Sequence, residues 1–306
     1  MTTMSIVIKA RKPGEPGVVA EFRELWQYRF LVRALVVREL KIRYKNSVLG
    51  IFWSMVSPLM QVLVMTIAIK YFLSSGPNNL SAYMLCAYLP WTFFQSAVLD
   101  GSSSILGQLG LLKKVYFPRE VPLISAVLAN FVHFLMSLGV FIIYRWVLSP
   151  IAVGWPGPPP IEILWLPVLM VVQLILTLGI AFYVCAWNVF YEDVKFIATM
   201  MMNFLFYLVP VLYFAENIFF SNNIANPQLR WWAYHLYLAN PLAWLVSAYK
   251  QVFFHIAVVS NTGAPVVHSA PFDWRYLLLT TITSCAICVS GYAYYNAKKW
   301  KFTERP

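Results

Sequence analysis

Residues 109–147 read LGLLKKVYFPREVPLISAVLANFVHFLMSLGVFIIYRWV. The stretch begins with a short basic and aromatic segment, KKVYFPRE at 113–120, and continues as a long apolar run. An apolar run of about 20 residues or more is long enough to cross a bilayer as a helix. A basic segment directly beside such a run is typical of a cytoplasmic connector. The stretch therefore predicts a membrane span preceded by a loop that contacts a soluble partner.

The composition of the whole chain excludes a soluble globular protein. Of its 306 residues, 60% are hydrophobic and 11% are charged, and the mean hydropathy is +0.65. A soluble globule needs a polar surface that so few charged residues cannot supply, whereas a bilayer solvates an apolar surface. The chain is therefore expected to be an all-α polytopic membrane protein.

Six membrane spans are predicted from the apolar runs. They cover about residues 49–73, 81–99, 121–148, 163–187, 196–214 and 276–297. Pro58 is expected to break the first span, because proline removes a backbone donor. The other segments are a cytoplasmic arm at 1–48, an outer loop at 215–273 with short re-entrant helices, and a cytoplasmic basic tail at 298–306.

The distribution of Lys and Arg sets the expected orientation. With both termini in the cytoplasm, 18 of the 23 basic residues lie on that side. Positive residues are retained on the cytoplasmic side of bacterial membranes, so this bias decides the topology. The net charge of +11 is then a topology signal and an attraction to anionic membrane lipid. Nucleic acid is not an expected partner, because the basic residues flank spans instead of covering one soluble face.

The arm carries an amphipathic pattern with two interpretations. Its apolar stripe consists of Phe22, Leu25, Trp26, Val36, Val37 and Leu40. Such a helix lies in the membrane interface. It is either a plain surface anchor or an interface helix that leads through residues 43–50 into the first span, and we favour the second interpretation.

The outer loop carries aromatic residues and one helix-start signal. Trp231 and Trp232 suit the boundary between membrane and water. Asn240 followed by Pro241 suits a helix start, with Asn as the N-cap and Pro at the first position. We therefore expect one or two short helices on the outer face.

Sequence signatures of catalysis are absent. The chain has no G-x-x-x-x-G-K-[ST] segment, so it carries no phosphate-binding loop of an ATPase. It has no cluster of His with carboxylates at metal-ligand spacing, and its spans lack the acidic relay of an ion-coupled pump. The chain is therefore expected to be a non-catalytic conduit, without a cofactor or metal of its own, that draws energy from a partner.

Aromatic residues within the spans have two possible roles. The candidates are Trp53, Tyr88, Trp91, Phe94, Tyr207 and Tyr213. Aromatic rings pack helices together, which is the more frequent role of any single ring, but they also stack on sugar rings. As a set they suit the wall of a pathway along which a polysaccharide slides.

Four separated motifs together resemble the permease subunits of ABC-2 type exporters, in the branch that exports polysaccharides and polyol phosphates. These motifs are RYKNSVLG at 43–50 with Trp53 and Pro58, KKVYFPRE at 113–120 continuing to Asn130, NVFYEDVK at 188–195, and Asn240-Pro241-Leu242. The match runs in order from about residue 25 to residue 298. Two positions depart from the family: Glu192 stands where Arg is frequent, and Val209-Pro210 stands where Ser-Pro is frequent.

The resemblance implies an ABC-2 (type V exporter-like) architecture in a bacterial inner membrane. It implies a homodimer with two copies of a separate ATP-binding subunit, which holds ATP and Mg, and a lipid-linked glycan such as O-antigen as substrate. The implied ATPase-coupling residues are Lys113, Lys114, Tyr116, Phe117, Pro118, Arg119, Glu120, Glu192 and Asp193. The implied interface-helix and hinge residues are Arg38, Arg43, Tyr44, Leu49 and Gly50.

Three other functions compete with polysaccharide export. A permease for a small hydrophobic drug or antibiotic shares the fold, and the KKVYFPRE segment and the aromatic outer loop argue against it. A membrane-embedded glycosyl or acyl transferase needs an acidic or histidine constellation that the sequence lacks. A purely structural membrane subunit has no use for a coupling segment.

Overall fold

The computed structural model describes residues 26–45, 53–69, 80–108, 110, 118–148, 160–219, 226–254, 258–259, 265–266, 272–299 and 302. Several residues that the resemblance singles out lie outside this part of the chain: Lys113, Lys114, Tyr116 and Phe117 of the coupling segment, and Leu49 and Gly50 of the hinge.

The described elements are almost entirely helical. In chain order the helices are α2 (Arg29–Tyr44), α3 (Trp53–Ile67), α4 (Leu80–Gly107), α6 (Glu120–Ile143), α8 (Leu166–Phe190), α9 (Val194–Leu208), α10 (Glu216–Phe219), α11 (Pro227–Leu238), α12 (Pro241–Phe253) and α13 (Trp274–Lys298). A π-helix, η3 (Tyr144–Leu148), continues α6, and a 3₁₀ helix, η4 (Ile161–Trp165), precedes α8. A two-stranded antiparallel hairpin, β1 (Val258–Val259) and β2 (Pro265–Val266), pairs Val258 with Val266; no strand was expected here.

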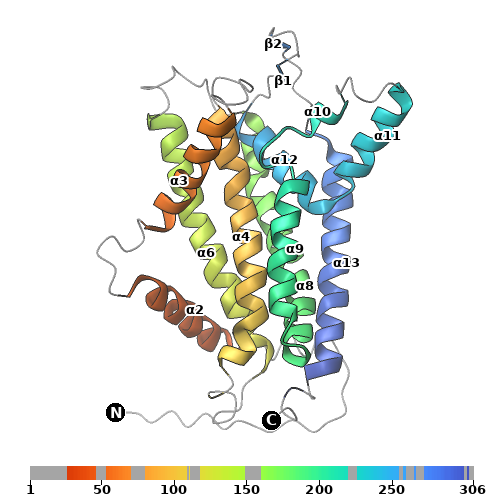
Figure 1. Ribbon diagram of the computed structural model, residues 1–306. Coiled ribbons are helices and arrows are strands. Elements are labelled where there is room, and N and C mark those ends of the chain that lie inside the picture. The colour runs from red at the N-terminus through yellow and green to blue at the C-terminus, as the bar shows by residue number, and fades with distance from the viewer. Residues whose placement is uncertain are drawn as a thin grey trace.

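The long helices form one bundle. Helices α3, α4, α6, α8, α9 and α13 run side by side, and α2 lies obliquely against one end of α6 (Figure 1). Helices α10, α11 and α12 gather at the opposite end with the hairpin (Figure 1). The α2 end and the α11 end of the bundle are named from these helices below. The last turn of α13 lies at the α2 end (Figure 1).

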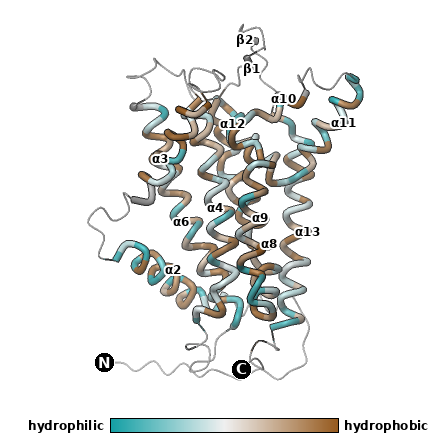
Figure 2. The backbone as a smooth tube through the Cα atoms, viewed as in Figure 1, coloured by the Kyte–Doolittle hydropathy of each residue, from teal (hydrophilic) through white to brown (hydrophobic). Residues whose placement is uncertain are grey.

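Length and hydropathy identify membrane-crossing helices in the described part of the chain. Three qualify: Glu120–Trp146, Ile161–Phe190 and Trp274–Lys298. Two further apolar helices, Val56–Ile67 and Val194–Leu208, are shorter. Hydrophilic residues alternate with hydrophobic ones along α2 (Figure 2). The fold is thus that of an all-α membrane protein.

Helix α4 extends well past the bound of 99 that hydropathy predicts for the second span. It continues through Asp100, Gly101 and three serines to Gly107. The serine hydroxyls donate to carbonyls one turn back: Ser102 Oγ to Leu99 at 2.7 Å and Ser104 Oγ to Gly101 at 2.7 Å. Serine side chains commonly bond the preceding turn in this way, so their polarity does not end the helix.

Helix α9 ends before the bound of 214 that hydropathy predicts for the fifth span. Its last residue is Leu208, and Val209 already has an extended backbone. Pro210 cannot donate to the helical ladder, and the residue before a proline avoids the helical region. The hydroxyls of Tyr213 and Tyr237 satisfy the free Leu208 carbonyl at 3.0 and 2.8 Å.

Pro58 does not break α3, contrary to the prediction. The described helix begins at Trp53, so Pro58 lies in its second turn. The ring removes a single backbone bond at that position. The helix continues to Ile67.

Two side-chain amides join α8 to α4 across the apolar core. Gln173 Nε2 donates to the Pro90 carbonyl at 2.7 Å, and Asn188 Nδ2 donates to the Ser102 carbonyl at 2.9 Å. Both amide side chains are buried, Gln173 completely. Polar side chains that reach a neighbouring backbone carbonyl fix helix register inside a membrane.

Glycine permits a close crossing of α8 and α13. A Cβ on Gly179 would lie 2.7 Å from the Cys288 backbone, and one on Gly291 would lie 2.4 Å from the Gly179 carbonyl oxygen. Small residues let transmembrane helices approach until their backbones touch. This contact locks the last helix of the chain onto the centre of the bundle.

Substitution of Gly291 by Leu is expected to lower thermal stability and the yield of monodisperse protein. The new side chain must push apart two backbones, an overpacking cost of about 1–3 kcal/mol or more. The measurement is a melting temperature of the purified protein in detergent. Gly139→Leu on α6 is the matched control, because a Cβ at Gly139 meets no atom within 4 Å. Equal melting temperatures for the two variants would contradict the close-crossing role.

Candidate functional site

Three residues from separate motifs meet where α2 crosses the bundle. Arg43 Nη2 donates to Asp100 Oδ2 at 2.9 Å, and Arg43 Nη1 donates to Asn130 Oδ1 at 3.1 Å. Asn130 Nδ2 closes the triangle by donating to Asp100 Oδ2 at 2.9 Å. Because these residues lie on α2, α4 and α6, this Arg43 cluster ties the outlying helix to two core helices.

Burial differs across the Arg43 cluster. The side chains of Arg43 and Asp100 are 37% and 47% exposed, whereas Asn130 is buried. Asn130 Nδ2 is also anchored on its own helix, to the Ala126 carbonyl at 3.0 Å. The cluster therefore has a fixed amide at its base and an ion pair that water can reach.

The face that α2 buries differs from the predicted stripe. Leu35 is buried against Val121 of α6, with Tyr28, Leu31 and Val32 packed around the pair. Trp26, at 70% exposed, lies on the outer face. The positions 28, 31, 32 and 35 follow the spacing of one helix face, so the sequence did contain the signal. The predicted stripe was assigned to the membrane interface, which stays a prediction, and its Phe22 and Leu25 lie outside the described residues.

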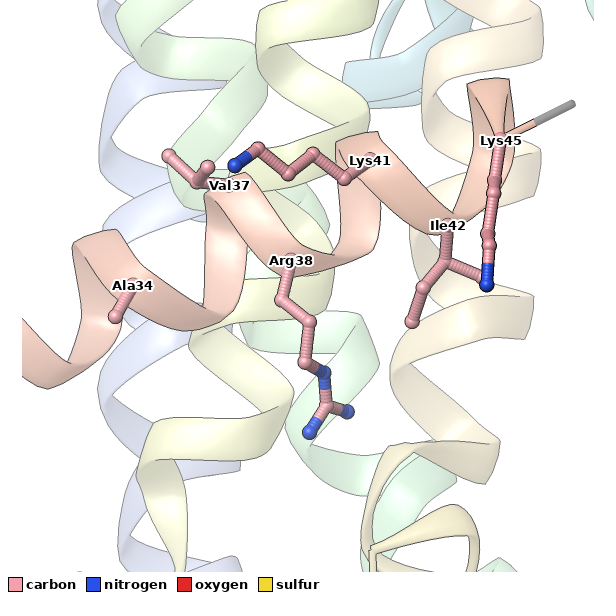
Figure 3. A pocket seen from close by; sticks show the side chains of 6 residues that line it. All are labelled: Ala34, Val37, Arg38, Lys41, Ile42 and Lys45. Carbon is pink, nitrogen blue, oxygen red and sulfur yellow. The ribbon is translucent and has the colours of Figure 1, made fainter.

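The outer face of α2 is basic. Arg38, Lys41 and Lys45 surround a shallow hollow together with Ala34, Val37 and Ile42 (Figure 3). Among the described residues, Arg38 pairs with its neighbour on the same helix, to Glu39 Oε1 at 3.2 Å, and both side chains are partly exposed. Tyr44 is half-buried. A cationic face with apolar stems suits lipid headgroups.

The expected coupling residues Arg119 and Glu120 turn inward. Lys299 Nζ donates to Glu120 Oε1 at 2.8 Å, and the two side chains are only 14% and 4% exposed. Tyr295 OH donates to the Arg119 carbonyl at 2.7 Å, and the Arg119 guanidinium donates to the Lys299 carbonyl. The contact of Glu120 with a partner stays a prediction; within this chain its carboxylate is buried.

The contacts just described form a Glu120 cluster that consists of Arg119, Glu120, Tyr295 and Lys299. Aromatic rings bring the second expected coupling segment, at 188–195, next to this cluster. The ring of Phe302 lies 5.4 Å from that of Tyr295 on α13 and 5.7 Å from that of Phe190 at the end of α8. Glu192 and Asp193 follow Phe190 and are exposed. The α2 end of the bundle thus brings residues 118–120 near the end of α8, with Glu192 and Asp193 exposed and Glu120 buried.

The aromatic residues predicted to line the pathway differ in exposure: some are buried inside the bundle, and others are partly or largely exposed. Trp91 and Phe94 are 1% exposed and pack inside the bundle, which fits the packing role. Tyr88 lies edge-on to Phe206 of α9 at 6.2 Å, and Tyr207 is 66% exposed. Tyr213 has its hydroxyl 3.0 Å from that of Tyr237. The side chain of Trp53 lies outside the described part of the structure.

At the α11 end, the expected helix start is present. The Asn240 side chain accepts a hydrogen bond from the Leu242 amide at 3.1 Å, and Pro241 occupies the first turn of α12. Trp231 and Trp232 on α11 are exposed at 47% and 66%, as an interfacial position requires.

Lys250 was not predicted as a structural residue. Its Nζ is buried on α12 and donates to the carbonyls of Pro210 at 2.5 Å and Tyr213 at 2.7 Å. Burial lowers the pKa of its ammonium to about 8, an effect that nearby Glu216 opposes. This side chain pins the turn after α9 onto α12, and no local sequence signal points to it.

Helices of this length and hydropathy, packed in one bundle, define a multi-pass membrane protein. No family model matches the chain. An O-antigen export system permease protein, RfbA, of Myxococcus xanthus is 31% identical over 233 residues, covering 76% of this chain and 83% of the relative. The RfbA protein of Klebsiella pneumoniae is 25% identical over 279 residues, covering 90% and 95%. The capsule polysaccharide export inner-membrane protein CtrC of Neisseria meningitidis is 21% identical over 192 residues, covering 61% and 69%.

The chain belongs to the family of O-antigen export permeases, within the ABC-2 type polysaccharide exporters. The resemblance in its motifs is confirmed. The competing readings as a drug permease or a transferase are not favoured.

Proposed function

We propose that this chain is the transmembrane subunit of an ATP-driven exporter that moves a lipid-linked polysaccharide, such as O-antigen, across a bacterial inner membrane. The observation that carries the proposal is its 31% identity, over 76% of its length, to an O-antigen export permease. The absence of a phosphate-binding loop from the sequence agrees with a subunit that does not hydrolyse ATP itself.

The proposed topology has six spans with both termini in the cytoplasm. The α2 end of the bundle is then the cytoplasmic end, in agreement with the 18 of 23 basic residues assigned to that side. Helix α4 and the two shorter helices α3 and α9 complete the six proposed spans. The basic exposed face of α2 lies against anionic headgroups on the cytoplasmic side. Helices α11 and α12 lie on the opposite, external side of the membrane.

The proposed assembly is a homodimer with two copies of a separate ATP-binding subunit, which holds ATP and Mg. Segment 113–118 docks on that subunit, together with Glu192 and Asp193. The Glu120 cluster supports this assignment because it fixes the end of the segment to α13. A movement of the partner is thereby carried to α6 and α13 together, and the Arg43 cluster carries it to α2 and α4.

The proposed pathway follows the exposed side of α9 at the two-fold axis. That side presents Phe196, Met200, Phe204 and Tyr207, each at least 60% exposed. The helix buries only Ala198 and Met202. An apolar and aromatic wall suits a glycan chain that must slide without tight binding, because ring stacking is weak and tolerant of register.

The experiment is a deletion of the gene in its host with complementation by a tagged chain. We expect the deletion to abolish surface glycan, and the purified complex to contain an ATP-binding subunit. The variant Tyr116→Ala, Phe117→Ala, Arg119→Ala should remain in the membrane but lose export and the ATPase. Ile161→Ala with Leu164→Ala, two exposed residues at the far end, is the matched control. Normal surface glycan in the deletion strain, with altered drug tolerance instead, would overturn the proposed substrate.

A further inference from the structure

A cavity of about 460 Å³ lies at the α11 end of the bundle. Its walls come from α10, α11, α12 and the start of α13. These helices gather at the end of the molecule opposite α2 (Figure 1). The volume is within the range of small-molecule sites in proteins.

Two residues that line the cavity each carry a side-chain oxygen with no hydrogen-bond partner among the described residues. The two oxygens are Ser247 Oγ and Gln251 Oε1, both fully shielded. Ser247 as a whole is only 5% exposed. The two residues are four apart on α12, so they share one face of that helix. Because buried polar groups are almost always paired, and both residues line the cavity, a rotation of either side chain would bring an unpaired oxygen to the hydroxyl groups of a ligand.

Aromatic rings form much of the remaining wall. Trp244 lies edge-on to Phe272 at 5.8 Å, and Phe272 lies edge-on to Trp274 at 5.7 Å. His235 stacks on Tyr276 at 6.0 Å between ring centroids. Fixed rings of this kind offer flat apolar faces to the C–H faces of a sugar, while polar groups at the side accept its hydroxyls.

The charges of the wall select against an anion. Two carboxylates, Glu216 and Asp273, line the cavity with one guanidinium, Arg275. Glu216 is buried, at 5% exposed. Carboxylates accept hydrogen bonds from hydroxyls and repel phosphate. A pyrophosphate or an acidic sugar is therefore disfavoured relative to a neutral sugar.

We propose that this cavity binds one or two neutral sugar units of a glycan on the outer side of the membrane. The inference rests on the proposed function for its source of glycan, and it adds a binding site to that function. The aromatic rings hold the sugar faces, and Ser247, Gln251 and Glu216 bind its hydroxyls. Such a site retains the leading end of an emerging chain and opposes its return.

The test uses the full-length protein in lipid nanodiscs and neutral hexoses and their methyl glycosides as probes. We expect binding with a millimolar dissociation constant, read from tryptophan fluorescence and from saturation-transfer NMR. Gln251→Leu and Trp274→Leu should each weaken binding by about tenfold or more, as the loss of one buried hydrogen bond or of one stacking face on a ring that is 49% exposed implies. Leu236→Ala on α11, at 76% exposed, is the control and should bind as wild type.

Each other outcome has a definite meaning. No hexose binding by the wild-type protein, or undiminished binding by both cavity variants, overturns the proposal. Binding of inorganic phosphate or of anionic-lipid vesicles in place of sugars identifies a headgroup site and also overturns it. Failure of the proposed function looks different, since the deletion strain would keep its surface glycan while the purified chain still binds hexose. Ser247→Ala keeps the test valid if a bulkier substitution prevents folding.

Discussion

Export is expected to fall by about tenfold or more when Asp100 is replaced by Asn, while the chain still inserts in the membrane. The carboxylate of Asp100 accepts from Arg43 at 2.9 Å and from Asn130 at 2.9 Å, so it joins α2 to α4 and α6. An amide carries no charge and replaces one acceptor by a donor. Coupling between sites typically amounts to about 1–3 kcal/mol, or roughly 5–150-fold in an equilibrium. Loss of the negative charge removes the ion pair with Arg43 and weakens both hydrogen bonds to this side chain, which should uncouple α2 from the movement of the bundle.

The measurement is the amount of surface glycan in a deletion strain, normalised to the amount of chain in the membrane. Arg38→Gln is the matched control, because it removes a similar pair on the same helix, Arg38 with Glu39 at 3.2 Å. That pair joins no second element, and exposed ion pairs of this kind contribute little. Equal losses for the two variants would mean that α2 acts only through its charge on the lipid surface.

A double-mutant cycle separates the cluster from its individual charges. Arg43→Gln combined with Asp100→Asn should export no worse than either single variant, because the same link is broken in each. Additive losses would contradict a shared link. Such a result would assign Arg43 and Asp100 to independent contacts.

Local signals in the sequence were sufficient wherever the structure is decided locally. The Asn240-Pro241 pair predicts the start of α12, and the side chain of Asn240 does cap it. The pair Asn226-Pro227 carries the same signal and starts α11, with the Asn226 side chain accepting from Gln228 at 2.9 Å. Both cases depend on a bond between residues two apart, which the sequence displays directly.

The ends of the helices differ from the predicted span bounds where a polar residue stays helical or an apolar residue does not. The serines after Asp100 looked like the end of a span, but their hydroxyls bond back and the helix continues to Gly107. The run through Phe214 is apolar, yet Pro210 ends the helix at Leu208. Hydropathy indicates whether a residue prefers lipid or water, whereas the ends of these helices depend on hydrogen bonds to the backbone.

The candidate sites depend on contacts between distant residues, which a single sequence does not display. Arg43 and Asn130 belong to quoted motifs, but Asp100 does not, and 57 residues separate Arg43 from Asp100 and 30 separate Asp100 from Asn130. Lys299 reaches Glu120 across 179 residues. The described residues of the two implied coupling segments, 118–120 and 192–193, lie at the α2 end of the bundle, and their contact with a partner stays a prediction. The resemblance does not indicate that the Glu120 carboxylate accepts a hydrogen bond from Lys299 of the same chain.

Reversal of the buried pair at the start of α6 is expected to destabilise the protein strongly. Glu120→Lys sets two ammonium groups where the structure has one ion pair of 2.8 Å between side chains 4% and 14% exposed. Breaking a buried pair typically costs about 3–5 kcal/mol, because a charge remains desolvated and unbalanced. The expected result is a clear drop in melting temperature in detergent. Lys298→Gln, a change at the neighbouring partly buried lysine, should leave it nearly unchanged.

The swapped variant Glu120→Lys, Lys299→Glu shows how the pair acts. We expect it to regain much of the melting temperature, since opposite charges face each other again across the α6–α13 contact. Export should return with stability if Glu120 is a positioning residue that fixes segment 113–120 on α13. Restored stability without export would mean instead that the Glu120 side chain meets the ATP-binding subunit directly, which its burial argues against. Unrestored stability would show that the Arg119 and Tyr295 contacts beside the pair, not its charges, hold the two helices together.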